Sequence, residues 1–146
     1  MIPLKHPTVV VPVDFSDDTE AAIRSGLERV DDPSGLHVVH VLVPLDYASP
    51  GVMFGTISDA SREKAIRENL GKILAKIGVA GVQVAVPIGD PGLKITDYAK
   101  DINADLIIVP SHGFHGVKRF LLGSTAERII RHAHCSVLVL RRRDAD

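Results

Sequence analysis

The regular alternation of short apolar runs with amphipathic stretches is the feature that most constrains how this chain folds. The apolar runs have strand length and lack the polar alternation of a half-exposed strand, so each strand must be buried on both faces. Strands of this kind, separated by helices, predict a parallel sheet covered on both sides. The runs lie at Thr8–Asp14, Leu36–Val43, Val82–Val86, 105–110 and Ser136–Leu140.

We therefore predict an α/β fold, with residues 1–146 forming a single domain around a five-stranded, doubly wound, Rossmann-like parallel sheet of order 3-2-1-4-5. The intervening helices are expected at Thr19–Val30, from about residue 60 to Ile77, after the "GDPG" turn, and at Ser124–His132. In "GDPG", Asp90 is expected as the N-cap and Pro91 as the first helical residue. Residues 44–59 are the least regular part of the chain and the part we expect to be most mobile.

Length and composition narrow the class of protein. A chain of 146 residues suits one domain with a sizeable core. No apolar run approaches the roughly 20 residues of a membrane span, and the N-terminus lacks the apolar region of a signal peptide. The single cysteine, Cys135, excludes an internal disulfide and fits a reducing compartment. A cytoplasmic protein is therefore expected.

Charge is distributed unevenly along the chain, although the net charge is only -1. Residues 110–143 contain seven Lys or Arg side chains and a single acidic one, whereas the preceding residues are net acidic. A local cationic surface suits a small anion such as a nucleotide phosphate. No basic stripe interleaved with aromatic residues occurs, so nucleic acid is not an expected partner.

The segment "IVPSHGFHGVKRFLLGST", residues 108–125, has the features of an anion-binding loop. Ser124 and Glu127 form an S-x-x-E pattern that predicts a capping box at the start of the last helix. The first N–H groups of that helix have no partner within it and attract an anion, and Gly123 lets a phosphate approach the backbone. The loop is neither a P-loop nor a G-x-G-x-x-G motif. Pro110, at its start, has no N–H to donate.

The chain resembles the universal stress proteins over nearly its whole length. The similar stretches include "VVVPVDFSDDTEAAI", "HVVHVLVP", "GDPGLKITDYAKDINADLIIVPSHG" and "LLGSTAERIIRHAHCSVLVL". The nucleotide-binding branch of the family has the loop pattern G-x2-G-x9-G-[ST]. Gly113, nine further residues, Gly123 and Ser124 match its last three elements, whereas proline takes the position of its first glycine.

The resemblance implies a small regulatory protein of the stress response that binds ATP, or AMP or ADP, with Mg²⁺ or Mn²⁺. It implies that Asp14 contacts the ribose and adenine, and that Gly113 and Gly123 let the triphosphate lie against the backbone. Pro110 would give a reshaped contact near the sugar. The implied nucleotide-binding residues are Pro12, Val13, Asp14, Val41, Pro110, Gly113, Gly123, Ser124 and Thr125. It also implies a homodimer paired through Ser136–Leu140, and an unidentified regulatory protein partner.

Several alternatives remain open from the residues alone. The protein could instead be a slow ATPase, or a nucleotide-free interaction protein of the same family, which Pro110 favours. Asp14 could simply cap the turn that follows it, and His40 is expected to be a core histidine. The loop residues His112 and His115 could polarise a phosphate, carry protons or simply be solvated, and Lys118 and Arg119 could steer the anion. A zinc site at His132, His134 and Cys135 is not expected, because no fourth ligand is near.

Overall fold

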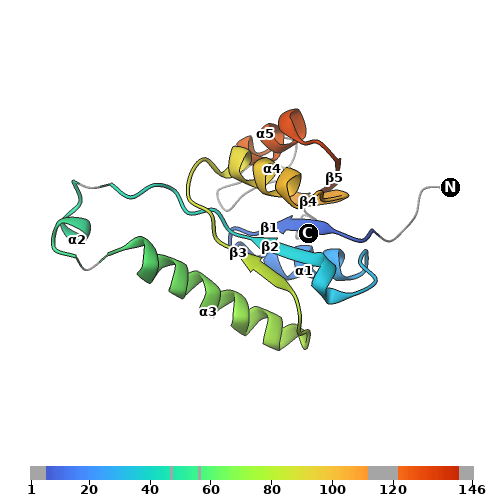
Figure 1. Cartoon of the computed structure of the whole chain (residues 1–146), viewed down its shortest axis with the longest axis horizontal. Helices are drawn as coiled ribbons and strands as arrows, with labels where there is room; N and C mark the ends of the chain where they lie inside the picture. The colour runs from blue at the N-terminus through green and yellow to red at the C-terminus, as the bar shows by residue number, and fades with distance from the viewer. Residues whose placement is uncertain (1–5, 47, 56, 112–121, 142–146) are drawn as a thin grey trace, which may run out of the picture.

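The computed structural model describes residues 6–46, 48–55, 57–111 and 122–141. Its centre is one five-stranded parallel sheet of order β3-β2-β1-β4-β5, as predicted (Figure 1). The strands are β1 (Val9–Pro12), β2 (Leu36–Val39), β3 (Gln83–Ala85), β4 (Leu106–Pro110) and β5 (Ser136–Leu140). The helices are α1 (Thr19–Leu27), the 3-10 turn η1 (Pro33–Gly35), α2 (Pro50–Met53), α3 (Asp59–Ile77), α4 (Pro91–Asp101) and α5 (Ser124–His132).

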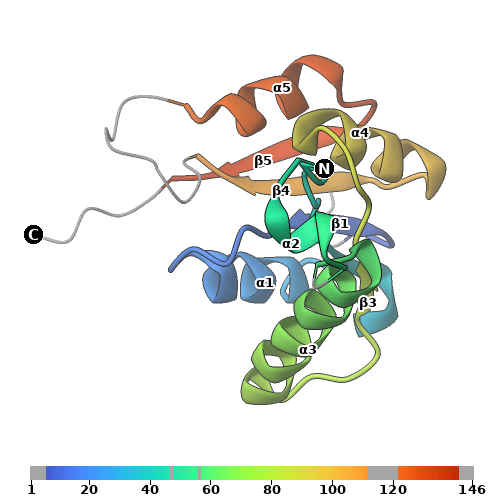
Figure 2. The same cartoon turned by 90° about the vertical axis from the view of Figure 1, so that its left-hand side faces the viewer.

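The sheet lies between two layers of helices (Figures 1 and 2), and a hydrophobic cluster lies on each of its faces. Alternate residues of each strand point to opposite faces, which explains why the strands had to be apolar throughout. Helices α1 and α3 cover one face, where Ile23 and Leu70 belong to the same hydrophobic cluster as Val11 of β1. Helices α4 and α5 cover the other face, where Ile95 and Ile129 pack in the same cluster as the even-numbered Val10 of β1.

The predicted positions of the elements are confirmed, but four strands and α1 are shorter than expected. β4 begins at Leu106 instead of Asp105, and α1 ends at Leu27 instead of Val30. β1 ends at Pro12 instead of Asp14, β2 ends at Val39 instead of Val43, and β3 covers Gln83–Ala85 instead of Val82–Val86. A single parallel bridge between Leu42 and Ile88 continues the β2–β3 direction beyond the strands. The early ends of β1 and β2 lie at the carboxyl edge of the sheet, where α/β folds bind ligands.

The "GDPG" turn acts as predicted. The Asp90 carboxylate caps α4, since its Oδ2 accepts the Leu93 N–H at 3.0 Å. Its Oδ1 accepts from Nη1 of Arg128 on α5 at 2.8 Å. The Arg128 side chain also crosses Gly92, where an added Cβ would lie within 2.7 Å of it. The turn therefore joins α4 to α5 and fixes the helix layer beside the carboxyl end of β4.

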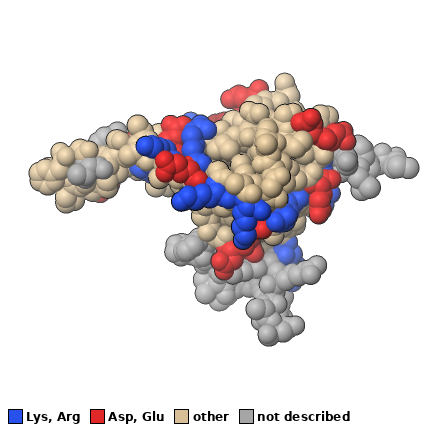
Figure 3. Space-filling view, turned by 90° about the horizontal axis from the view of Figure 1, so that it is seen from below, with Lys and Arg blue, Asp and Glu red and all other residues tan. Residues whose placement is uncertain are grey.

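Helix α2 lies on an arm between β2 and α3 that projects from the body (Figures 1 and 3). The sequence predicted no helix there. Met53 and Phe54 at the end of α2 are 68% and 81% exposed. The arm is largely without charge, whereas Lys, Arg, Asp and Glu side chains mix over the body in Figure 3. Within the described residues, no helix has the length and apolar character needed to cross a membrane.

A histidine–tyrosine contact links the sheet to α4. Nδ1 of His37 on β2 lies 2.7 Å from the Tyr98 hydroxyl on α4, and both side chains are half-buried. Burial lowers the pKa of His37 and raises the pKa of Tyr98. Both shifts favour the neutral forms of the two groups. The folded protein therefore holds His37 in its neutral form more strongly than the unfolded chain does.

This contact predicts a loss of stability in mild acid. The pKa of His37 is lower in the folded protein than in the unfolded chain. The contribution of His37 to the free energy of unfolding is therefore complete above the ordinary histidine pKa of about 6.5, and it is lost as the pH falls through the pKa of the folded state. At pH values below about 6.5, we expect the urea concentration at the midpoint of unfolding to decrease as the pH falls. The decrease should be smaller in His37→Gln. Equal pH dependence in the two proteins would contradict this role of His37.

Candidate functional site

Strands β1 and β4 separate toward their carboxyl ends. Their ladder contains only the pairs Val9–Leu106 and Val10–Ile107. β1 nevertheless continues beside β2 to Pro12, and β4 continues beside β5 to Pro110. The strand order reverses between β1 and β4, so this fork is the topological switch point of the sheet, where doubly wound folds bind ligands.

Two prolines account for the fork. The Val13 N–H donates to the Val39 carbonyl at 2.9 Å, so the backbone groups of the odd-numbered residues of β1 point toward β2. The backbone groups of alternate residues point to opposite sides of a strand, so those of Pro12 point toward β4. The Ser111 N–H, just after β4, donates to the Leu140 carbonyl at 2.9 Å, so the backbone groups of the odd-numbered residues of β4 point toward β5. By the same alternation, those of Pro110 point toward β1. The next two rungs between β1 and β4 would need an N–H from each proline. Neither has one, and the ladder stops.

The end of β1 turns sharply at Asp14. Oδ1 of Asp14 accepts the Ser16 N–H at 3.0 Å, which closes an Asx turn. Phe15, between them, has a φ of 61°, in the left-handed region that bulky residues rarely adopt. The alternative role of Asp14 as a turn cap is thus present in the structure. It engages only one carboxylate oxygen within the described residues, so it does not exclude a ligand contact by the other.

The backbone of Val41 has unused hydrogen-bonding groups. The backbone groups of its two neighbours point toward β3: the His40 N–H donates to the Ala85 carbonyl at 3.1 Å, and the Leu42 N–H donates to the Pro87 carbonyl at 2.8 Å. The Val41 N–H and carbonyl therefore face β1, and neither forms a hydrogen bond within the described residues. Val41 is only 9% exposed. Unpaired backbone groups at so buried a residue are rare and indicate a missing partner.

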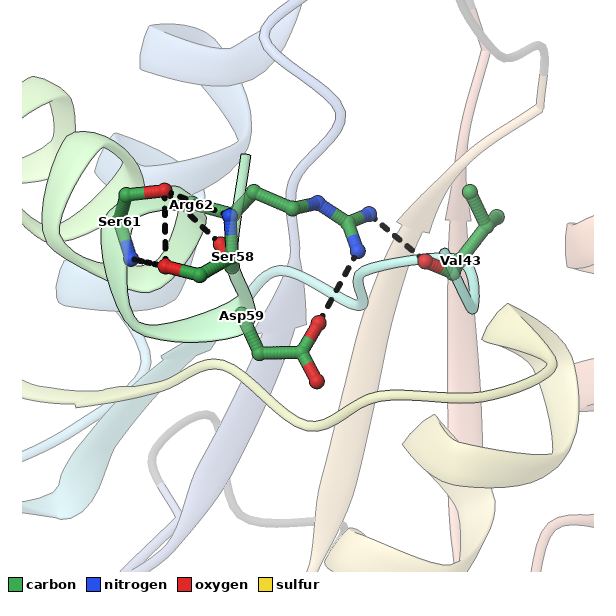
Figure 4. Close-up of polar contacts among 5 residues, drawn as sticks. All are labelled: Val43, Ser58, Asp59, Ser61 and Arg62. Carbon is green, nitrogen blue, oxygen red and sulfur yellow. Dashed lines mark hydrogen bonds and ion pairs between the residues drawn. The ribbon is translucent and has the colours of Figure 1, made fainter. Parts of the chain in front are cut away.

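The stretch after Val41 is fixed by the start of α3 (Figure 4). Nη2 of Arg62 donates to the Val43 carbonyl at 2.6 Å, while Nη1 lies 3.4 Å from Oδ1 of Asp59. The helix start is itself held by reciprocal bonds between Ser58 and Ser61. These contacts hold the backbone that leads away from Val41. Arg62 carried no sequence signal, because a helical arginine usually reads as a solvated surface residue.

The capping-box prediction for α5 was wrong, although its boundaries were correct. Gly123 is the N-cap, and its carbonyl accepts the Glu127 N–H at 2.9 Å. Ser124 is the first helical residue, and its side chain forms no capping hydrogen bond among the residues that the structure describes. Glu127 pairs instead with Arg131, one turn along the helix, at 2.7 Å. Hydrogen bonding to a neighbour in the same helix competes with the reach back to the cap.

The start of α5 still offers three donors. The N–H groups of Ser124, Thr125 and Ala126 find no acceptor within the described residues, as expected for a first helical turn. The Gly123 N–H is already used, because it donates to the Ser111 carbonyl at 2.7 Å. This bond brings the two ends of the loop together beside β4. It therefore places the positive end of α5 beside the fork.

Most of the sequence-predicted site residues meet at one edge of the sheet. Pro12, Val13, Asp14 and Val41 lie at the ends of β1 and β2, while Pro110, Gly123, Ser124 and Thr125 lie across the fork. Gly113, His112, His115, Lys118 and Arg119 fall outside the described residues. Within the described part of the chain, no group of three or more His, Cys, Asp or Glu side chains is placed to hold a metal ion.

Comparison with known proteins identifies the family. Residues 6–141 match the model of the universal stress protein family. The chain belongs to the universal stress protein family. A protein of Staphylococcus aureus strain USA300, named as a member of the same family, is 31% identical over 143 residues, covering 94% of this chain and 86% of that one.

Solved structures, including two that are named as universal stress proteins, have the same fold. The hypothetical protein MJ0577 is 25% identical and superposes with a TM-score of 0.77, covering 99% of this chain and all of that one. A universal stress protein in complex with cAMP is 22% identical, with a TM-score of 0.64 and coverage of 94% and 98%. The Arabidopsis thaliana protein At3g01520, with AMP bound, is also 22% identical, with a TM-score of 0.60 and coverage of 94% and 93%.

The caps of α4 and α5 predict different responses to the removal of a polar side chain. Asp90→Ala removes a formed cap and should lower the free energy of unfolding by about 1 kcal/mol. Ser124→Ala removes no cap and should change it by less than about 0.5 kcal/mol. Urea denaturation of the nucleotide-free protein measures both. If Ser124→Ala lowered the free energy of unfolding as much as Asp90→Ala does, Ser124 would have to be a cap of α5 after all.

Proposed function

We propose that this universal stress protein is a regulatory protein that binds an adenine nucleotide at the fork between β1 and β4. The unpaired N–H and carbonyl of the buried Val41 carry the proposal. They form a donor and an acceptor on one residue, at the edge of the sheet where such folds bind ligands. The cAMP and AMP held by two proteins of the same fold support the choice of ligand class.

Adenine complements this pair of groups. Its exocyclic amino group donates, and a neighbouring ring nitrogen accepts, so one edge of the base can satisfy both the carbonyl and the N–H of Val41. Guanine has a carbonyl in place of the amino group, so in the orientation that suits adenine it would oppose the Val41 carbonyl with a second acceptor. A site of buried polar groups discriminates strongly against a ligand that leaves them unpaired. We therefore infer selectivity for adenine over guanine.

The phosphates would lie on the opposite side of the fork. The free N–H groups of Ser124, Thr125 and Ala126 and the helix dipole of α5 suit an anion. The Asp14 oxygen left free by the Asx turn suits a ribose hydroxyl, and Pro12 and Val13 would line the same pocket. Pro110 would offer its carbonyl near the sugar, and Gly113 would adjoin the phosphates as the family pattern implies.

The ligand of the proposal is ATP, with AMP and ADP as smaller forms that make the same base contacts. Mg²⁺ or Mn²⁺ would be held mainly by the phosphates, as is usual for these ions with nucleotides. We propose binding without efficient turnover. Asp14 and Asp46, the acidic residues nearest this edge in the sequence pattern, each accept a backbone N–H in a local turn, from Ser16 and Ala48. The proposed location is the cytoplasm, with an unidentified regulatory partner.

The Val41 backbone gives a direct test of the nucleotide site. Val41→Pro removes its N–H and leaves the carbonyl, so AMP and ATP affinity should fall at least about tenfold, or roughly 1.4 kcal/mol. Val41→Ala keeps the N–H and serves as the matched control, with affinity expected within about threefold of wild type. Isothermal titration calorimetry with AMP, ATP and GMP would measure all three proteins, and wild type should favour AMP over GMP.

The same titrations distinguish the nucleotide-free alternative. Pro110→Gly restores the glycine of the family pattern and should change ATP affinity by less than about tenfold if Pro110 only reshapes a sugar contact. Wild type that binds neither AMP nor ATP at millimolar concentration would overturn the proposal. If Pro110→Gly then created binding, the loop would be a disabled nucleotide site and the interaction-protein reading would stand.

We also propose a homodimer formed by the free edge of β5. β5 is the last strand of the sheet order, and an apolar edge strand exposes unpaired backbone groups. Leu140 accepts from Ser111, so the even-numbered residues of β5 bond to β4, and the N–H groups of Val137 and Val139 point outward. Pairing of two copies of β5 about a two-fold axis would satisfy these groups.

A proline at the outward position tests this assembly. Val137→Pro removes one outward N–H without removing a donor to β4, and should convert the dimer to a monomer. Val137→Ala loses a similar amount of side-chain packing but keeps the N–H, and should remain dimeric. Light scattering coupled to size-exclusion chromatography measures the mass. A monomeric wild type at micromolar concentration would rule out the dimer.

A further inference from the structure

His40 forms a hydrogen bond that the regular sheet pattern would give to another residue. Its Nδ1 lies 2.7 Å from the Val13 carbonyl oxygen, which belongs to the end of β1. His40 follows the last residue of β2 and is half-buried. A carbonyl oxygen only accepts, so Nδ1 must carry the proton in this contact. The expectation of a passive core histidine is therefore incomplete.

The register identifies the donor that His40 replaces. Pro12 pairs with Val39, so Val13 would pair with His40, and Val13 already donates its N–H to Val39. In a parallel ladder, the next rung would run from the Val41 N–H to the Val13 carbonyl. That rung is not formed, and the imidazole of His40 supplies the donor instead. β2 stops at Val39, and the Val41 N–H is left without its ladder partner.

The turn after β1 holds the imidazole in this position. The Phe15 ring packs on His40, with ring centroids 4.9 Å apart and planes inclined at 52°. Phe15 reaches it from a backbone in the left-handed region, closed by the Asx turn of Asp14. The unusual backbone conformation, the aromatic contact and the hydrogen bond therefore act together on one ring.

We propose that His40 is a positioning residue of the nucleotide site, whose imidazole stands beside the Val13 carbonyl oxygen in the place of the Val41 N–H and so keeps that N–H free for a ligand. The inference rests on the proposed adenine-nucleotide function for the identity of that ligand. Without the imidazole donor, the Val13 carbonyl would take the Val41 N–H, β2 would extend by one rung, and the base would lose its donor. His40 thus sets where the sheet ends and the site begins.

Two substitutions separate this role from ordinary packing. His40→Asn keeps an N–H donor near the position of Nδ1, whereas His40→Leu keeps apolar volume and removes the donor. We expect His40→Leu to bind AMP at least about tenfold more weakly than wild type, and His40→Asn to bind within about threefold of it. The melting temperature of each variant is measured alongside, since loss of packing alone would weaken binding in proportion to stability.

Measurements on the nucleotide-free protein decide the inference independently of nucleotide binding. Imidazole ¹⁵N shifts should identify the Nδ1–H tautomer of His40, and the Val41 amide should exchange faster in wild type than in His40→Leu. A protected Val41 amide in wild type, the opposite tautomer, or AMP binding by His40→Leu at the wild-type level would overturn the inference. Wild type that binds no AMP, yet shows the Nδ1–H tautomer and fast Val41 exchange, would reject the proposed ligand and retain the role of His40.

Discussion

The arrangement of this protein depends on where the hydrogen-bond ladders of its parallel sheet stop. A buried strand must pair its backbone groups, and a parallel sheet does this by repeating the same rung along each pair of strands. Here the rungs end early on both sides of β1. Two facing prolines, Pro12 and Pro110, end them toward β4, and the imidazole of His40 ends them toward β2. The proposed nucleotide site lies in the region between the points where these ladders end.

The proposed nucleotide site is made largely of main-chain groups. Val41 contributes its N–H and carbonyl, and α5 contributes the N–H groups of its first turn. Side chains act mainly by holding these groups in place, as Arg62 does through the Val43 carbonyl and Asp14 does through its turn. Such a site makes weak demands on side-chain identity at the contact positions themselves.

The fold could be predicted from the sequence because its alternation of apolar runs and helices admits few arrangements, and each run needed burial on both faces. The strand ends were harder to predict, because a side chain that replaces a backbone donor, as His40 does, leaves no periodic signal. The capping box failed at Ser124 because Arg131, one turn beyond Glu127, offered a competing partner. The significance of Pro12 and Pro110 became visible only once the register showed that their nitrogens face each other.

The hydrogen bond from the Gly123 N–H to the Ser111 carbonyl joins the two ends of the segment between β4 and α5. Residues 112–122 thus enter and leave the body at neighbouring points. An insertion or deletion within the segment need not move either end, and closing a longer loop between fixed ends costs little additional entropy. The segment can therefore vary while the end of β4 and the start of α5 stay in place. Its length and composition can differ between related proteins without disturbing the pairing of β4 with β5.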